Sequence, residues 1–351
     1  MKRIINIMII AAAVMFIFAC NSVDKVTVTE SRSNEPAGRI VIYTSMYGDI
    51  VQEMERALAR QFPDTLIQFS YGGTGTLQFK LEQEIASGRL DCDILMVAEP
   101  SYSLELKERG ILHPYISKEA SALAFDYDPE GYWYPVRISN MVLAFNPLIH
   151  SRNSIPNSFY DFANDPGVSG AIAMSNPVVS GTSLAAITAL RDKYGYEYFD
   201  ALGRQGVHID SGAVAMTKLE TGEYKVIMVL EESILHKREE EGSRLEVIYP
   251  EDGSIVIPST IMIVNERWSA NRNIEVAQAI TDWFLSPEGQ RAVVAGWMHS
   301  TRSNFNMIPF DAIPTAEVQN NSIPVIWENV YREREEIRTN FEEYILYRRD
   351  R

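Results

Sequence analysis

Two series of apolar, β-branched runs separated by helix-like segments constrain the fold of this chain more than any other feature. In the first series, strand-like runs at residues 39–44, 66–71 and 93–97 alternate with segments whose apolar residues recur at helical spacing. A second series occupies residues 171–230. Because strands that alternate with helices pair in parallel and carry the helices on the faces of the sheet, we predict an α/β fold.

Two long strand-like segments, at residues 133–145 and 254–264, contain no helix and follow the two series. We interpret them as strands that cross between two lobes, each a mainly parallel sheet flanked by helices. The predicted limits are residues 39–136 and 260–351 for the first lobe and 137–259 for the second. A charged segment at the end of the chain, residues 326–347, carries one apolar stripe and is predicted to be a helix packed on a lobe.

The N-terminus has the pattern of an export signal. A basic start is followed by an apolar run at residues 4–18 and by the sequence Ile-Phe-Ala-Cys ending at Cys20. This ending resembles the lipobox of bacterial lipoprotein signal peptides, which implies a signal peptide over residues 1–20 and a lipid anchor on Cys20. An uncleaved membrane anchor is the alternative. Residues 21–38 are polar and aperiodic, which is typical of a flexible tether to an exported domain in the periplasm or on the cell surface.

Composition excludes several classes of function. The chain has 47 acidic and 32 basic residues, a formal net charge of −15, which argues against nucleic acid or an anionic membrane as a partner. The sequence contains no Gly-x-Ser-x-Gly, His-Glu-x-x-His or Walker-type motif, and its five histidines lack metal-ligand spacing. We therefore expect no catalytic residues, no cofactor and no metal site, and predict that the protein is not an enzyme.

Two junctions between a strand and a helix carry small hydroxyl residues around glycine, near residues 72–76 and 180–183. The first N–H groups of a helix have no partner within it and lie at the positive end of its dipole, so such junctions bind anions. Serine and threonine are also common helix caps, and glycine is common in tight turns, so a structural role is the alternative. The candidate donors are Thr74, Gly75, Thr76, Ser180, Gly181, Thr182 and Ser183.

Several segments, in this order, resemble those of substrate-binding proteins of bacterial ABC importers with the type-II periplasmic-binding-protein fold. They lie at residues 40–48, 88–95, 108–112, 141–146, 222–228 and, most specifically, 283–290 (Trp-Phe-Leu-Ser-Pro-Glu-Gly-Gln). The resemblance is greatest to the branch that binds ferric ion, 2-aminoethylphosphonate or sugar phosphates. It implies a monomer that closes two lobes on a solute and delivers it to a membrane permease.

The positions that bind iron in this branch indicate which class of ligand this chain takes. Members that bind iron directly usually carry adjacent tyrosines after the strand equivalent to residues 226–230, whereas this chain has Glu231, Glu232 and Ser233 there. The histidine common in the first lobe is also missing from residues 45–48. We therefore expect a small anionic ligand such as a sugar phosphate or phosphonate. Ferric iron, a polyamine, and a sensory or adhesive role of the same fold are the alternatives.

Other candidate ligand-binding residues come from their positions in this pattern. Arg137, on the predicted crossing strand, is a candidate clamp for an oxyanion, with a hinge residue paired to a carboxylate as the alternative. Ser211 is either a donor or only a helix cap. The remaining candidates follow predicted strands and are Ser45, Tyr47, Glu99 and Glu232, of which the two glutamates would accept from sugar hydroxyls or an ammonium group. A solvated loop residue is the alternative for Glu99.

Overall fold

The computed structural model describes residues 38–46 and 48–347. All the described residues belong to one compact unit, Glu35–Arg351. The predicted signal peptide, Cys20, Tyr47 and the predicted tether lie outside the described residues, except for Gly38, which begins the first strand instead of ending the tether. No helix among the described residues is long and apolar enough to cross a membrane.

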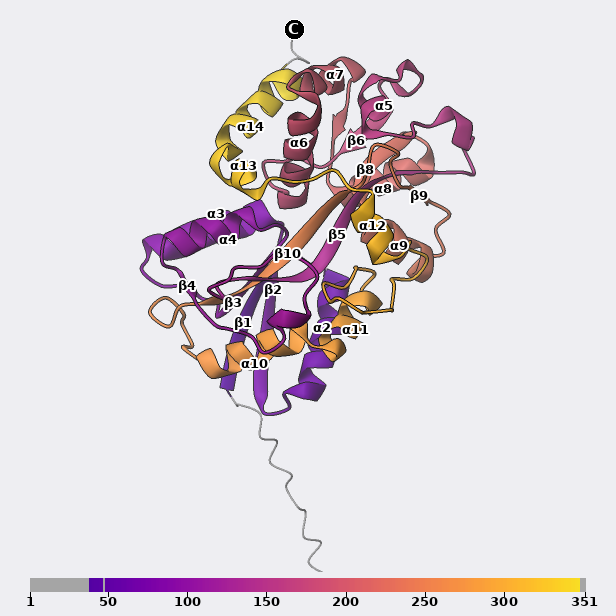
Figure 1. The fold of residues 1–351 in the computed structure, drawn as a ribbon. Helices are drawn as coiled ribbons and strands as arrows, with labels where there is room; N and C mark the ends of the chain where they lie inside the picture. Colours follow the sequence, from indigo (N-terminus) through magenta and orange to yellow (C-terminus); the bar gives the residue numbers. More distant parts are fainter. Residues whose placement is uncertain (1–37, 47, 348–351) are drawn as a thin grey trace, which may run out of the picture. The chain divides into compact units, whose positions relative to one another are not determined.

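The strands of the described residues form one continuous sheet (Figure 1). Its order is β2-β1-β3-β10-β5-β8-β6-β7, with β4 beside β10 and β9 beside β5. The bounds are β1 (Gly38–Thr44), β2 (Thr65–Tyr71), β3 (Ile94–Val97), β4 (Leu112–His113), β5 (Tyr134–Phe145), β6 (Ile172–Met174), β7 (His208–Ile209), β8 (Val226–Leu230), β9 (Glu246–Ile248) and β10 (Ile255–Val264).

The pairing changes direction at the centre of the sheet. Strands β1, β2 and β3 are parallel to one another, and so are β6, β7 and β8. Between these groups, β10 and β5 pair in antiparallel fashion with each other and with the neighbouring strands β3 and β8. The two segments predicted to cross between the lobes are therefore β5 and β10, and they join what we expected to be two sheets into one.

Helices cover both groups of strands. Their bounds are α2 (Gly48–Gln61), α3 (Thr74–Ala86), α4 (Ser101–Glu108), α5 (Phe159–Asn164), α6 (Gly181–Tyr194), α7 (Glu197–Gln205), α8 (Gly212–Thr221), α9 (Glu231–Glu240), α10 (Ile274–Leu285), α11 (Pro287–Ala295), α12 (Thr315–Asn320), α13 (Trp327–Arg332) and α14 (Arg334–Phe341). Helix α3 begins at Thr74, so the last three residues of the predicted junction at 72–76 already belong to its first turn.

Buried apolar side chains gather around the two groups of strands. We call β1–β3 with α2, α3, α4, α10 and α11 the first half, and β6–β8 with α5–α9 the second half. Ile42, Met54 and Phe284 belong to one apolar cluster of the first half. Leu190 and Phe199 belong to the large cluster of the second half. Each half therefore has an apolar interior of its own, which is what a hinged pair of bodies requires.

The end of the chain differs from the prediction in two ways. The predicted single helix is divided at Glu333 into α13 and α14, and a π-helical turn, Glu342–Leu346, follows. Its apolar stripe packs on the second half, where the rings of Phe341 and Phe199 meet edge to face with centroids 5.9 Å apart. The predicted lobe limits stay a prediction, but this packing favours counting α13 and α14 with the second half.

Candidate ligand-binding site

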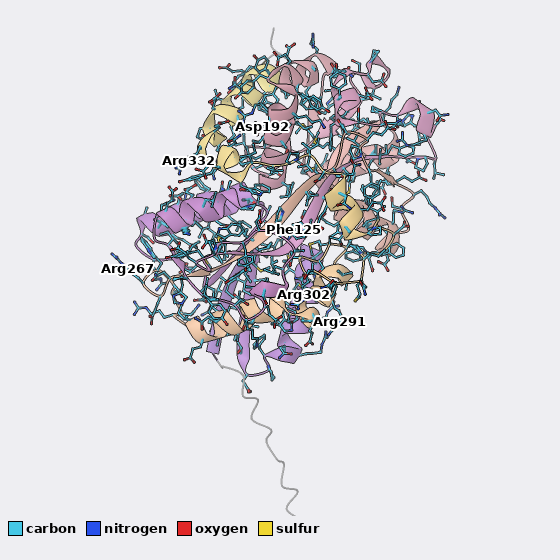
Figure 2. All side chains as sticks on the ribbon, viewed as in Figure 1. Phe125, Asp192, Arg267, Arg291, Arg302 and Arg332 are labelled. Atoms are coloured by element: carbon cyan, nitrogen blue, oxygen red, sulfur yellow. The ribbon has the colours of Figure 1, made fainter. Side chains whose placement is uncertain are left out.

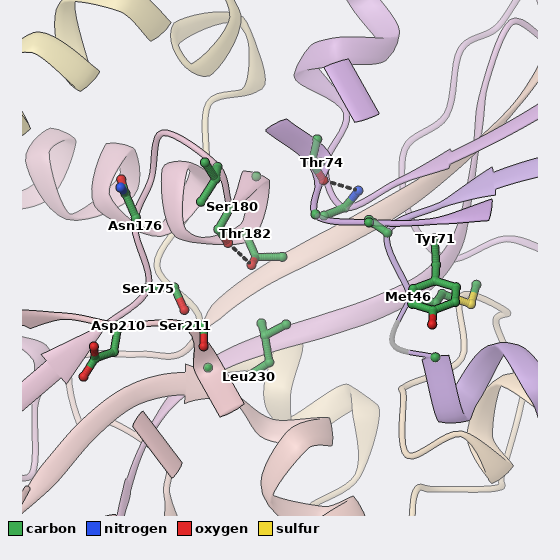
Figure 3. A pocket seen from close by; sticks show the side chains of 18 of the residues that line it. Met46, Tyr71, Thr74, Ser175, Asn176, Ser180, Thr182, Asp210, Ser211 and Leu230 are labelled. Carbon is green, nitrogen blue, oxygen red and sulfur yellow. Dashed lines mark hydrogen bonds between the residues drawn. The ribbon is translucent and has the colours of Figure 1, made fainter. Parts of the chain in front are cut away.

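A cavity of about 460 Å³ lies between the two halves. Helices α2, α3, α6 and α8 all contribute their N-terminal turns to its wall (Figure 3). The central strand β5 contributes Arg137. Further walls come from the ends of β2, β3, β6, β7 and β8. The lining residues are Ser45, Met46, Gly48, Tyr71, Gly72, Gly73, Thr74, Ala98, Arg137, Ser175, Asn176, Val179, Ser180, Gly181, Thr182, Ile209, Asp210, Ser211, Gly212 and Leu230.

The N-terminus of α6 presents the clearest set of donors. Ser180 caps the helix, because its Oγ accepts a hydrogen bond from the N–H of Ser183 at 3.2 Å and lies 3.1 Å from Oγ1 of Thr182. The N–H groups of Gly181 and Thr182 donate to no acceptor among the described residues. Both residues line the cavity, so two unused amides at the positive end of a helix face it.

The neighbouring helices add hydroxyl groups. Ser211 caps α8 by accepting from the N–H of Val214 at 3.4 Å, and it also lines the cavity. The two roles considered for Ser211 are therefore compatible, because a serine cap leaves the hydroxyl hydrogen for another acceptor. Oγ1 of Thr74, in the first turn of α3, accepts from the N–H of Ala98 at 3.3 Å.

Arg137 owes its position to an irregularity in the central strand pair. The register of β5 against β10 shifts between Ser259 and Thr260, which face Arg137 and Pro135, so Val136 is the extra residue of a bulge. Proline cannot donate to the ladder, and bulges redirect the side chains beside them. The guanidinium, 4% exposed, donates to the Ser139 hydroxyl at 3.2 Å and lines the floor of the cavity.

The charge of Arg137 is partly balanced by Glu232, the second residue of α9. Nη1 of Arg137 lies 3.6 Å from Oε1 of Glu232, and the same oxygen accepts from the Ser139 hydroxyl at 2.8 Å. Burial raises the pKa of Glu232, while the guanidinium and the hydroxyl favour its ionised form. Arg137 is thus both a residue that lines the cavity and one paired with a carboxylate, so it combines the two roles considered for it.

Glu231, the first of the two glutamates that stand where iron-binding members carry tyrosines, is occupied elsewhere. Its Oε2 accepts from the side-chain amide of Asn140 at 3.0 Å and lies 2.9 Å from Nε2 of His299, while Oε1 accepts from the Tyr249 hydroxyl. The carboxylate is 1% exposed and does not line the cavity. This network joins α9 to β5 and to the segment after α11, so it is structural.

The two halves touch beside the cavity. The N–H of Gly75 donates to the carbonyl of Val179 at 3.1 Å, so this predicted ligand donor is used between the halves. A Cβ at Gly181 would lie 2.9 Å from Cβ of Thr74, a distance that real side chains do not show. The glycines therefore allow the N-termini of α3 and α6 to meet, and the cleft of this structure is closed.

The cavity brings together many of the predicted site residues from distant parts of the chain. Those that line it are Ser45, Thr74, Arg137, Ser180, Gly181, Thr182 and Ser211. Those that do not are Gly75, Thr76, Glu99, Ser183 and Glu232. Ser183 donates to the carbonyl of Ser175 at 2.6 Å. Glu99 is fully buried two residues before α4 begins, near Arg334 and Arg338 of α14. Tyr47 and Cys20 lie outside the described residues.

Some lining residues have weaker signals in the sequence. Asn176 begins the turn before α6, where its Oδ1 accepts from the N–H of Val178 at 2.9 Å. An Asn-Pro pair is typical of a turn and gives no sign of a binding site. Asp210 precedes the cap of α8. A hydrogen bond from Tyr224 and the ammonium of Lys218 hold its pKa below the usual range, so it remains a carboxylate. Tyr71 is the last residue of β2, and the periodicity of the sequence there predicts the strand but not a binding residue.

The described residues contain no group of three or more histidine, cysteine, aspartate or glutamate side chains that could hold a metal ion. The cavity itself offers one carboxylate, Asp210, and one phenol, Tyr71, among its described lining residues. Hard trivalent cations need several anionic oxygens. The donors on this wall are instead of the kind that hold an oxyanion.

Comparison with known proteins identifies a family of binding proteins that agrees with this site. A sequence profile described as bacterial extracellular solute-binding protein matches residues 92–312. An uncharacterized protein of Haemophilus influenzae is 25% identical over 275 residues, which cover 74% of this chain and 76% of the relative. The profile spans all of the second half, the central strands, and β3, α4, α10 and α11 of the first half.

Solved structures with the same fold bind different solutes. The periplasmic binding protein AfuA from Actinobacillus pleuropneumoniae, with fructose 6-phosphate bound, superposes with a TM-score of 0.75 at 22% identity, covering 89% of this chain and 99% of that one. Iron-bound HitA from Pseudomonas aeruginosa gives a TM-score of 0.74 at 19% identity, covering 88% and 99%. At these identities the likeness shows the periplasmic-binding-protein fold but not the ligand. The ligand has to be inferred from the chemistry of the cavity.

Proposed function

Because this chain belongs to the family of bacterial extracellular solute-binding proteins, components of ABC transporters, we propose that its solute is a small organic phosphate or phosphonate. The solute is held between the two halves and handed to a membrane permease. Family membership also confirms the expectation of a binding protein and not an enzyme. The lipid anchor on Cys20 remains part of this proposal.

One observation carries the proposal. The N-termini of four helices and the buried guanidinium of Arg137 line the same cavity, and the amides of Gly181 and Thr182 are unused among the described residues. Helix N-termini stabilise anions by their N–H groups and dipoles, and arginine matches the planar oxygens of a phosphate. A dianionic phosphoryl group therefore gains more from this wall than a neutral or cationic solute does.

The cavity is larger than a phosphate needs. A volume of about 460 Å³ suits a small organic molecule, and its other surfaces include the apolar side chains of Met46, Val179, Ile209 and Leu230. The carboxylate of Asp210 adds an acceptor for a hydroxyl or ammonium group of the same ligand. This favours an organic phosphate over inorganic phosphate alone. The ligand printed for AfuA, fructose 6-phosphate, is one compound of this class.

The first test is thermal unfolding of the purified protein with fructose 6-phosphate, 2-aminoethylphosphonate, inorganic phosphate, ferric citrate or spermidine. A ligand that binds only the native state stabilises it by about 2.7 kcal/mol at a hundred times its Kd. We expect a rise in Tm with an organic phosphate or phosphonate. Stabilisation by ferric citrate or spermidine alone would contradict the proposal.

Two threonine variants locate the binding site. Thr182→Val removes a hydroxyl from the cavity wall, while Thr76→Val makes the same change on α3 at a residue that does not line the cavity. We expect Thr182→Val to weaken binding of the stabilising ligand about tenfold, the loss of one hydrogen bond to a charged group, and Thr76→Val to leave it unchanged. If isothermal titration showed the same loss of affinity in both variants, the N-terminus of α6 would not be part of the binding site.

A further inference from the structure

A second set of contacts between the halves lies away from the ligand cavity, where α4 meets α13 and α14. Helix α4 follows β3 and shares an apolar cluster with α3, to which Leu77, Leu81, Tyr102 and Leu106 contribute. Arg109, directly after α4, also pairs with Glu82 of α3 at 2.5 Å. Helices α3 and α4 therefore behave as one rigid pair of the first half.

The C-terminal helices are fixed to the second half in the same way. Val330 of α13 and Ile337 of α14 lie in the apolar cluster of α6 and α7. Glu333, between the two helices, pairs with Arg191 of α6 at 2.6 Å, and the side-chain amide of Asn329 donates to Asp192 of α6 at 3.2 Å. Helices α6, α13 and α14 therefore form a second rigid group.

Charged and polar side chains join the two groups. Arg334 of α14 pairs with Glu105 of α4 at 2.7 Å, and its side chain is only 12% exposed. Glu108, at the end of α4, accepts from Arg332 at 2.7 Å and from the hydroxyl of Tyr331 at 2.9 Å. Figure 2 shows Arg332 at the edge of the C-terminal helices that faces the first half.

Glu99 lies beneath these pairs at the start of α4. It is fully buried, its Oε2 accepts from the N–H of Ser101 at 2.6 Å, and its Oε1 has no hydrogen-bond partner among the described residues. The charges of Arg334 and Arg338 favour the ionised form of Glu99, against the effect of burial. Two arginines of α14 therefore act electrostatically on a carboxylate of the first half.

We propose that α4, α13 and α14 form a clasp that opens and closes together with the ligand cleft. The cleft contact, from Gly75 to Val179, joins α3 to the turn before α6, so the same two rigid groups make both contacts. A hinge movement on β5 and β10 that separates α3 from α6 must also separate α4 from α13 and α14. The clasp stabilises the closed conformation through residues that touch no ligand.

The clasp has a consequence for affinity that does not depend on which solute binds. A binding protein whose closed form is more populated before binding loses less free energy on closure, so its apparent affinity is higher. Arg334 and Glu105 would then be affinity-determining residues although neither lines the cavity. The inference concerns closure and stands whether or not the solute is an organic phosphate.

The test measures the opening of the cleft without any ligand. Spin labels on cysteines introduced at the exposed residues Gln83 of α3 and Glu197 of α7 report the distance between the halves by double electron–electron resonance; Cys92 is buried. We expect the wild-type protein to show a short, closed distance, and Arg334→Met to lower the ratio of closed to open molecules about tenfold. Arg291→Met, an exposed arginine on α11, is the matched control and should change nothing.

Exchanging the charges of the exposed pair Glu108 and Arg332 tests the clasp with variants that are not expected to unfold the protein. Glu108→Arg and Arg332→Glu each place like charges together and should each favour the open distance, whereas the double variant should return toward the wild-type distribution. The clasp would be refuted by a wild-type protein with no short distance. Identical distributions in all the variants would refute it as well, because α4 and α13 would then not separate when the cleft opens.

Discussion

At the scale of single residues, Arg137 connects the hinge with the ligand. It lies on β5, beside the bulge opposite Ser259 and Thr260, and its guanidinium faces both the cavity and the buried carboxylate of Glu232. A buried ion pair contributes little net stability, because desolvation offsets the attraction, but removal of one partner leaves an uncompensated charge. Arg137 therefore matters to stability mainly through what its loss would do to Glu232.

We predict that Arg137→Met destabilises the protein by about 3–5 kcal/mol and abolishes binding of the phosphate ligand. Without the guanidinium, the folded-state pKa of Glu232 rises further above its unfolded value. The variant then keeps its stability below the pKa that Glu232 has in the unfolded chain. It loses stability as the pH rises through the pKa that Glu232 has in the folded protein. Urea unfolding at about pH 5 and about pH 8 should show the larger deficit at the higher pH. Adding Glu232→Gln should recover most of the stability but no binding; if it recovers none, Glu232 is not the cause.

At the scale of elements, the site is made by the ends of helices and not by their faces. The N-terminal turns of α3 and α6 come from different halves and meet where Gly75 and Gly181 have no side chain. The same contact holds the loop before α6, whose residues line the cavity. Closure and assembly of the site are therefore one event, as expected for a protein that responds to its ligand by a shift in population.

The variant Gly181→Ala should hinder closure of the cleft without preventing the protein from folding. The new Cβ would lie 2.9 Å from Cβ of Thr74 in the closed form, while the first turn of an isolated second half accommodates alanine. We expect an affinity loss of about tenfold or more. The unliganded protein should move toward the open cleft with only a small fall in Tm, because the open form is still folded. Gly72→Ala is the control, since its Cβ would approach no atom closer than 3.7 Å in the same cavity. A fall in unliganded Tm with unaltered affinity would show that Gly181 serves the fold and not closure.

At the scale of the whole described unit, the halves share more than a hinge. One sheet runs through both, because β5 and β10 pair with each other and with strands of each half. The segment after α11 crosses back to the second half, and the buried network of Glu231, His299 and Tyr249 holds it beside β5. Interior contacts that continue across a hinge couple the unfolding of the two sides.

We therefore predict a single unfolding transition, in contrast to the separate transitions of loosely joined domains. In differential scanning calorimetry the calorimetric and van't Hoff enthalpies should agree, with and without a stabilising ligand. His299→Ala, which leaves Glu231 buried with fewer partners, should lower Tm without splitting the transition. Two resolved transitions in the wild-type protein would mean that the shared sheet does not couple the halves.

The sequence by itself determined the fold class and most of the local structure. Periodicity and turn residues located β5, β10 and the helix that Ser180 caps, because these signals depend on neighbours along the chain. The two crossing segments predicted the two-lobed architecture, and the family resemblance, confirmed by the profile match, supported it. The seven candidate residues that line the cavity were selected on these grounds.

Tertiary structure alone decided how the candidate residues are used. Gly75 and Ser183 have the right sequence context for a ligand donor, yet Val179 and Ser175 accept their hydrogen bonds. Glu99 follows a strand as a site residue would, but the arginines of α14 lie beside it because the C-terminal helices pack on the second half. A residue's partner depends on which distant segment folds against it, and local patterns carry no information about that segment.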